Sequence, residues 1–287
     1  MNQFGFEFKI ALADVGFKIH ADFAMELEAG YVPFLVENNT ETDIDVHCFN
    51  KLPAFDLTNF KLAFEAKNET QQFYAIYITE TEWCYVIYNQ KTINQIQQIA
   101  FINRDFTRWK IYATDNLPLK YPMGPIIMHC LTLYTDALLI HASCTFDGKK
   151  SRLFTGVSGV GKSTMSRIWS EAGAQIINDD RLLIRKIDNE FFVYNTPMQY
   201  VDFSKKAPLH AIYLIRHASQ NRLNRVKGAF AISKVIAHCI QNNFDKALIN
   251  KRIDLVAEMC ACTPVYELGF VPTHEVVRYI TANETKQ

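Results

Sequence analysis

A glycine-rich segment that ends in a lysine and a serine is the part of this sequence best suited to chemistry. The stretch GVSGVGKS, residues 156–163, fits the pattern G-x-x-x-x-G-K-[S/T]. Glycines allow a tight turn in which successive backbone N–H groups point inward and form an anion-binding nest before a helix. In such a loop the lysine ammonium reaches the β- and γ-phosphates of a nucleotide, and the serine hydroxyl ligates Mg²⁺. We therefore expect ATP and Mg²⁺ as cofactors, bound by Gly156, Val157, Ser158, Gly159, Val160, Gly161, Lys162, Ser163 and Thr164.

Two adjacent carboxylates, Asp179 and Asp180, follow a short apolar run that comes one helix after the loop. A second strand at this place would bring a carboxylate to the phosphate site. One carboxylate could then hold the metal ion, directly or through water, and the other could accept the proton of an attacking hydroxyl. Phosphoryl transfer needs little more than positioning, charge neutralisation and such a base. Taken alone, the doublet also fits a solvated turn or a helix cap.

The elements expected to position these residues are strands mixed with helices, which is typical of an α/β domain. Strands are predicted at 138–146 and 152–155, a helix at 162–172 that ends at Gly173, and a strand at 175–178 that leads to the doublet. Other expected strands are 211–215 and 265–268. Other expected helices are 124–134, 230–240, 253–260 and 272–280.

The first part of the chain has a different character, with short strands and turns. FYAIYITETEWCYVIY, residues 73–88, is predicted to form a β-hairpin around its polar centre. His20 and His47 are interpreted as surface or core residues rather than ligands. Because residues 115–125 hold three prolines and a glycine, we expect a β-rich N-terminal domain at 1–118, of unknown role, and the phosphate-binding domain at 119–287.

Composition narrows the classes of partner and compartment. Lys+Arg and Asp+Glu are equal at 30 each, so the charge does not favour a nucleic acid or an anionic membrane as partner. The N-terminus lacks the pattern of a signal peptide, and the most apolar window, residues 126–140, is too short to span a bilayer. Seven cysteines without a C-x-x-C pair indicate reduced, buried thiols. We expect a cytoplasmic protein that binds no nucleic acid and no membrane; a homo-oligomer remains open.

Three motifs in this order resemble a known family. IHAS at 140–143, the glycine-rich loop and NDDR at 178–181 resemble the catalytic domain of bacterial HPr kinase/phosphorylase and its shorter kinase relatives, over about residues 120–270. The resemblance implies a P-loop kinase domain with the fold type of phosphoenolpyruvate carboxykinase. It also implies that Asp179 is the catalytic base, that His141 lies near the transferred phosphoryl group and that Lys162 binds phosphate. It further implies Ser163 on Mg²⁺; with Asp179 as the base, Asp180 is the carboxylate of the doublet that we expect to hold the metal.

The sequence departs from that family in one segment. HPr kinase/phosphorylases carry an LEIRGxG-like segment with a metal-binding glutamate, whereas residues 195–206 here read NTPMQYVDFSKK. Asp202 is the only carboxylate in it. The N-terminal half has no match to the regulatory domain of the family, so the protein HPr is not implied as substrate. We expect a kinase with little phosphorolysis of its phosphorylated product.

The function expected from these residues is an ATP-dependent kinase. It would transfer the γ-phosphoryl group to a serine-like hydroxyl of a peptide, protein or small molecule. One alternative is an ATP-dependent lyase like phosphoenolpyruvate carboxykinase, although the chain is about half the usual length. A second is a non-enzymatic nucleotide-binding module, which would not need the base. A third alternative, a P-loop motor ATPase, is disfavoured. Such a motor has a run of four apolar residues before its acidic residue, whereas the residues before Asp179 read QIIN.

Overall fold

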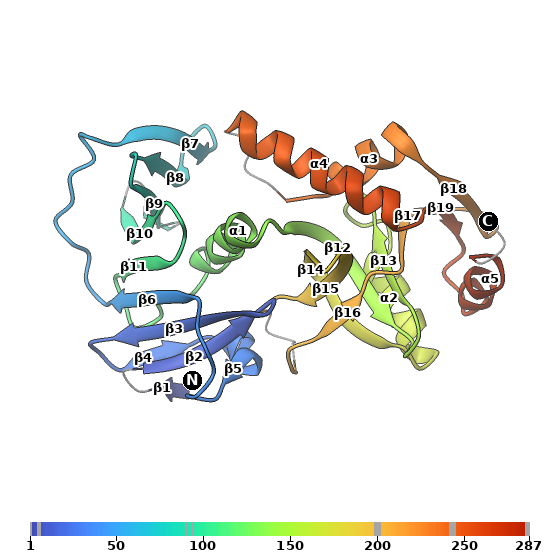
Figure 1. The fold of residues 1–287 in the computed structure, drawn as a ribbon, viewed down its shortest axis with the longest axis horizontal. Helices are drawn as coiled ribbons and strands as arrows, with labels where there is room; N and C mark the ends of the chain where they lie inside the picture. Colours follow the sequence, from blue (N-terminus) through green and yellow to red (C-terminus); the bar gives the residue numbers. More distant parts are fainter. Residues whose placement is uncertain are drawn as a thin grey trace. The chain divides into compact units, whose positions relative to one another are not determined.

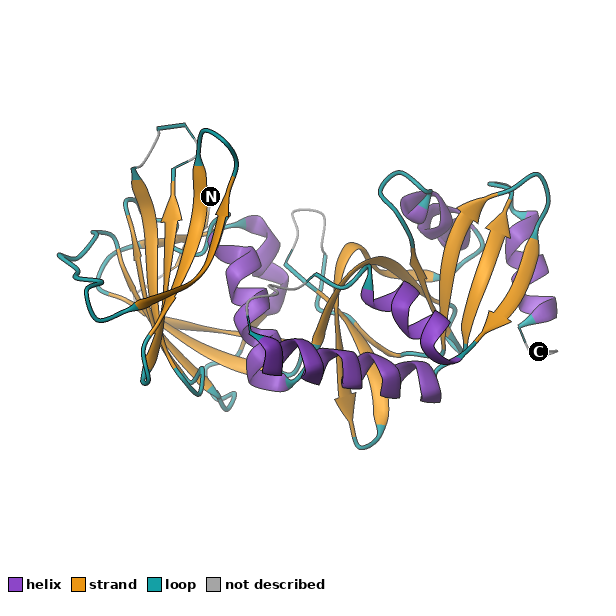
Figure 2. Cartoon of the chain, turned by 90° about the horizontal axis from the view of Figure 1, so that it is seen from above, coloured by secondary structure: helices purple, strands orange, loops and turns teal. Residues whose placement is uncertain are grey.

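The computed structural model describes residues 2–4, 7–89, 91–92, 95–197, 202–240 and 245–284. The chain divides into two compact units, one of Met1–Tyr134 with Pro197–Ser204 and the other of Thr135–Thr196 with Lys205–Gln287. The fold is mixed α/β, and each unit is built on one large sheet with few helices (Figures 1 and 2).

The first unit contains a nine-stranded sheet in the order β5-β2-β3-β6-β11-β10-β9-β8-β7. The pairs β3·β6 and β6·β11 are parallel, and the other pairs are antiparallel. The expected hairpin at 73–88 is confirmed as β8 and β9. In chain order the strands are β2 (Glu7–Leu12), β3 (Val15–Ala21), β5 (Leu35–Val36), β6 (Ile44–Phe49), β7 (Lys61–Lys67), β8 (Gln72–Ile78), β9 (Glu82–Tyr88), β10 (Ile96–Asn103) and β11 (Arg108–Ala113). A separate pair joins β1 (Asn2–Phe4) to β4 (Met25–Leu27), and η1 (Ala29–Phe34) is a 3₁₀-helix.

Helix α1 (Met123–Thr135) belongs almost entirely to this first unit, so the division falls later than the expected boundary at 118. The proline-rich segment before the helix is fixed to the sheet, because Nε2 of Gln98 donates to the carbonyl oxygen of Pro118 at 3.1 Å. A Cβ on Gly124 would lie 3.2 Å from the hydroxyl of Tyr31. Prolines interrupt regular structure but do not by themselves end a packing unit, and the helix after them contacts an earlier strand, since the side chains of Cys130 and Tyr85 of β9 form a hydrogen bond.

The second unit contains an eight-stranded mixed sheet in the order β16-β15-β14-β12-β13-β17-β19-β18. Its strands are β12 (Leu138–Phe146), β13 (Ser151–Thr155), β14 (Gln175–Ile187), β15 (Glu190–Asn195), β16 (Lys206–Pro208), β17 (Ala211–His217), β18 (Arg222–Val226) and β19 (Val265–Phe270). Its helices are α2 (Lys162–Glu171), α3 (Gly228–Ile236), α4 (Lys246–Cys262) and α5 (Glu275–Asn283).

The core of the second unit has two halves, one for each side of the sheet. One apolar cluster contains Leu153 together with Val235 of α3 and Val256 of α4. The other contains Phe154 with Trp169 of α2 and Ile280 of α5. Because successive strand residues point to opposite faces, Leu153 and Phe154 indicate that α3 and α4 cover one face and that α2 and α5 cover the other.

Most elements expected around the loop are confirmed, with two differences. Strands at 138–146 and 152–155 and the helix from 162 occur as β12, β13 and α2. The strand expected at 175–178 instead continues through both aspartates as the thirteen-residue β14, because the whole run pairs with β12 and β15. The helix expected at 230–240 ends at Ile236. None of the helices in the described ranges has the length and apolar character needed to cross a membrane.

Candidate functional site

The glycine-rich loop connects β13 to α2, the strand-to-helix context that the pattern requires. Gly159 and Gly161 have φ angles of 77° and 103°, which side chains with a Cβ rarely adopt. A Cβ on Gly161 would also come within 2.8 Å of the ring of Phe270, and one on Gly156 within 3.0 Å of the carbonyl oxygen of Ile215. The loop conformation therefore depends on glycine at these positions.

Lys162 is the first residue of α2 and directs its ammonium group back over the loop. Its Nζ donates to the carbonyl oxygens of Gly156 at 3.2 Å and Val157 at 3.3 Å. Burial lowers the pKa of Lys162, and the carboxylates of Asp180 and Asp179 act in the opposite direction. The positive charge thus lies at the loop itself, where the N-terminus of a helix also favours an anion.

The two aspartates have different partners. On β14, Asp179 pairs with Ser143 of β12, and its Oδ1 accepts a hydrogen bond from Oγ of Ser166 at 3.4 Å. Burial raises the pKa of Asp179, and hydrogen bonds from Ser163 and Ser166 limit the rise. Asp179 is therefore attached to the helix that begins at the loop, as a partly desolvated carboxylate.

Asp180 instead faces the neighbouring strand. Its Oδ1 lies 3.4 Å from Nε2 of His141, and its Oδ2 lies 3.7 Å from Nε of Arg181. Burial and the charge of Lys162 lower the pKa of His141, and Asp180 partly offsets them. The imidazole is thus held toward its neutral form, next to one carboxylate of the doublet.

A second histidine, His238, lies beside this group and was not expected from the sequence. The residues after α3 pair with β12 through two hydrogen bonds, from the amide of His141 to the carbonyl oxygen of His238 and from the amide of Ile240 to that of Leu139. Burial, Lys162 and His141 lower the pKa of His238, in that order. In the sequence, His238 is a histidine within the helix expected at 230–240, and nothing in that pattern indicates that it lies near the site.

The structure brings together the main residues predicted for the site. Lys162, Asp179, Asp180 and His141 interact electrostatically, and Ser163 contacts Asp179. The roles assigned to them remain predictions. Of the segment that departs from the HPr kinase pattern, residues 198–201 lie outside the described residues. Asp202 accepts a hydrogen bond from the amide of Phe203 at 3.0 Å and belongs to the first unit.

The donor set of the site suits a hard divalent cation. The side chain of Ser163 is exposed at the start of α2 and is hydrogen-bonded to Asp179. A hydroxyl and carboxylates are the oxygen ligands that Mg²⁺ prefers, usually together with water and substrate phosphates. A glycine-rich loop before a helix, an ammonium group and nearby hydroxyl and carboxylate oxygens are components that a nucleoside triphosphate with its metal would need.

The comparisons with known proteins give structural similarities but no sequence match. No protein-family model matches this sequence, and no curated protein matches it. Among solved structures, the chain is similar to the HPr(Ser) kinase/phosphatase from Coxiella burnetii, with 13% sequence identity and a TM-score of 0.28 over 51% of this chain and 98% of that one. A similarity at this TM-score supports no functional conclusion.

Proposed function

We propose that the second unit is an ATP-dependent kinase that transfers the γ-phosphoryl group to a serine-like hydroxyl of a peptide, protein or small molecule. One observation carries the proposal. Asp179, a carboxylate with a raised pKa, contacts Ser163 and Ser166 on the helix whose first residue is Lys162. This contact supports Asp179 as a base close to the expected phosphate and metal positions. A protein that only bound nucleotide would have no use for it.

In the proposed reaction, the proton of the acceptor hydroxyl moves to Asp179. The acceptor oxygen forms a bond to the γ-phosphorus, the bond to the bridging oxygen of ADP breaks, and ADP is released. The loop N–H groups and Lys162 stabilise the negative charge on the phosphates. Mg²⁺, held by Ser163 and Asp180, would neutralise further charge on the transferred group. His141, kept neutral, can donate a hydrogen bond to a phosphoryl oxygen.

The electrostatics of Asp179 fit the role of base. A general base works best when its pKa lies near the operating pH, and burial commonly brings this about for carboxylates. The pKa of Asp179 is shifted in that direction. Asp180, in contact with His141 and Arg181, is the carboxylate proposed for the metal.

The test is transfer from γ-labelled ATP to a panel of acceptors. Free serine, serine-containing peptides and small carrier proteins are incubated with the full chain and Mg²⁺, with the Asp179→Asn variant as matched control. Label in an acceptor with the wild type, and at least about 100-fold less with the variant, would support the proposal.

Three results would contradict it. Nucleotide binding without label in any acceptor would favour a binding module. Formation of phosphoenolpyruvate and CO₂ from oxaloacetate and ATP would favour the lyase. Transfer by Asp179→Asn at the wild-type rate would remove Asp179 from the proposed chemistry.

A further inference from the structure

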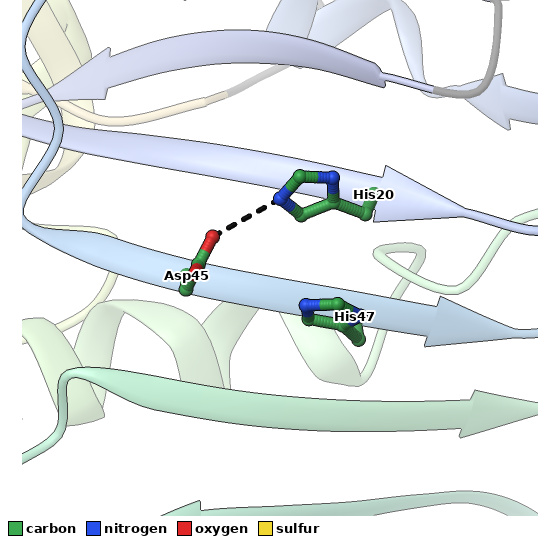
Figure 3. A group of neighbouring side chains, drawn as sticks. All are labelled: His20, Asp45 and His47. Atoms are coloured by element: carbon green, nitrogen blue, oxygen red, sulfur yellow. Dashed lines mark hydrogen bonds and ion pairs between the residues drawn. The ribbon is translucent and has the colours of Figure 1, made fainter.

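A second group of chemically capable side chains lies on the nine-stranded sheet of the first unit. His20 is on β3, and Asp45 and His47 are on β6 (Figure 3). His20 and His47 are direct partners in the parallel register of the two strands. Asp45 precedes His47 by two residues and therefore points to the same face. This face is open to solvent, since Asp45 and His47 are exposed while Val46 between them is buried.

The three side chains converge. One ring nitrogen of each histidine and one carboxylate oxygen of Asp45 all lie within 4.8 Å of one another. Nε2 of His20 is 3.1 Å from Oδ1 of Asp45, and the two imidazole rings stack at 4.7 Å between centroids. Figure 3 shows nitrogens of both histidines on the side toward the carboxylate.

We propose that His20, Asp45 and His47 bind a divalent transition-metal ion of the zinc class, with water completing its coordination. Two imidazole nitrogens and one carboxylate oxygen suit Zn²⁺, whereas Mg²⁺ and Ca²⁺ prefer oxygen ligands throughout. The three donors come from one face, so the remaining positions point to solvent. This site is independent of the proposed kinase chemistry.

Glu7 on β2 gives the group a supporting contact. Its Oε2 lies 3.2 Å from Nδ1 of His20, on the ring nitrogen opposite the one that faces Asp45. A carboxylate that accepts the other ring N–H of a metal-binding histidine fixes the ring orientation and makes the ligand more basic. Glu7 is therefore a positioning residue in this proposal.

Positively charged side chains lie near the proposed metal site. Nζ of Lys18 lies 3.2 Å from the same Oε2 of Glu7, so Glu7 offsets its charge. In the register of β11 and β6, Lys110 is opposite His47 and Arg108 is opposite Asp45. A competing description without metal is a His20 ring held between two carboxylates, Glu7 and Asp45, by contacts at its two nitrogens. The two descriptions differ in whether His47 is needed.

The full chain is first treated with a chelator to remove bound metal. It is then titrated with Zn²⁺ in the presence of excess Mg²⁺, and calorimetry measures the binding. Mg²⁺ competes for the carboxylates of Asp179 and Asp180, and any Zn²⁺ that stays bound in the His47 variant described next is assigned to positions outside the proposed site. We expect one Zn²⁺ per chain. The variants His47→Gln and Asp45→Asn, both at exposed positions, should lose this binding, and Glu7→Gln should weaken it about 10- to 100-fold. His274→Gln, an exposed histidine of the second unit, is the control that should bind as the wild type does.

Co²⁺ gives a second readout that separates the proposed site from the cysteines, of which Cys262 is exposed. Absorption typical of nitrogen and oxygen ligands, lost in His47→Gln, is expected. A thiolate charge-transfer band, equal Zn²⁺ binding by His47→Gln and the wild type, or no stoichiometric binding would each overturn the proposal. Circular dichroism of each variant establishes that loss of binding is not loss of the fold.

Discussion

His238 pairs with His141, and the backbone amide of His141 donates to the carbonyl oxygen of His238 at 3.0 Å. The adjacent residues Ile140 and Cys239 form an antiparallel bridge, so the two histidines are opposite each other and their side chains share a face. Both imidazoles have a lowered pKa, and Lys162 contributes to both shifts. The segment after α3 thereby brings a second histidine to the expected phosphate position.

From this pairing we predict that nucleotide binding takes up protons. A polyanion at Lys162 would cancel its repulsion of the two histidines and raise their pKa values toward the ordinary value of 6.5. Calorimetry at about pH 6 in buffers with different ionisation enthalpies should show proton uptake. His238→Gln should reduce it and His274→Gln should not. Equal uptake by His238→Gln and the wild type would show that His238 does not sense the nucleotide.

The same shifts predict how stability depends on pH in the free protein. Because the folded pKa values of His141 and His238 lie below the unfolded value of 6.5, the unfolded chain binds more protons between the two values. Folding therefore becomes more favourable as the pH rises through this range, and the contribution is lost below it. Urea unfolding of the wild type and of His238→Gln across this range measures the difference. If the free energy of unfolding depended more steeply on pH in His238→Gln than in the wild type, this dependence could not be attributed to His238.

Lys162→Ala is expected to remove much of the affinity for MgATP without unfolding the domain. The hydrogen bonds of the ammonium group are to carbonyl oxygens within the loop, those of Gly156 and Val157, and the apolar residues that anchor α2, such as Met165 and Trp169, remain in place. Calorimetry with MgATP measures the loss, and thermal unfolding verifies the fold. Unchanged affinity in the variant would show that the loop is not the nucleotide site.

Asp179→Asn and Asp180→Asn are expected to separate chemistry from metal binding. Asp179→Asn should keep nucleotide affinity and lose transfer by about 10²–10⁴-fold, since only the base is removed. Asp180→Asn should raise the Mg²⁺ concentration needed for half-maximal activity. Steady-state transfer over a range of Mg²⁺ concentrations distinguishes them. If Asp179→Asn turned over normally and Asp180→Asn did not, the two roles would be reversed.

Glu284→Gln is expected to destabilise the second unit by about 3 kcal/mol, because it breaks a buried ion pair and leaves part of the charge of Arg152 uncompensated. Glu284 is 2.7 Å from Nη2 of Arg152 and accepts from the hydroxyl of Tyr213 at 2.8 Å. Although burial acts to raise it, these contacts hold the pKa of Glu284 below its usual 4.5. Their stabilisation should therefore be lost as the pH falls through the lowered value.

The matched control for this ion pair is Glu171→Gln. Glu171 contacts Arg167 and His274, both exposed, and each such surface pair contributes at most about 1 kcal/mol. Chemical denaturation of the three proteins gives the free energies of unfolding. Equal destabilisation by the two substitutions would mean that the contacts between Glu284 and Arg152 add nothing beyond a surface pair.

The local parts of the site follow from the sequence alone. A tight loop between a strand and a helix is specified by its own glycines, and Lys162 and Ser163 are placed by being the first residues of that helix. The hairpin of β8 and β9 is local in the same sense, since its two strands are neighbours in the chain and alternate around a polar turn. Order and spacing were sufficient to predict that a carboxylate of the doublet Asp179–Asp180 would lie near the loop.

Pairing between distant segments was decided only by the tertiary structure. The sequence predicted a strand that ends before Asp179, but long-range pairing with β12 extends β14 through both aspartates and brings Asp180 to His141. His238 reaches the site because its segment pairs with the first residues of β12, which precede those that pair with β13. His20 and His47 meet because β3 and β6 run parallel in one register. Strand register depends on which faces of the whole sheet are buried, and no local run of residues encodes that choice.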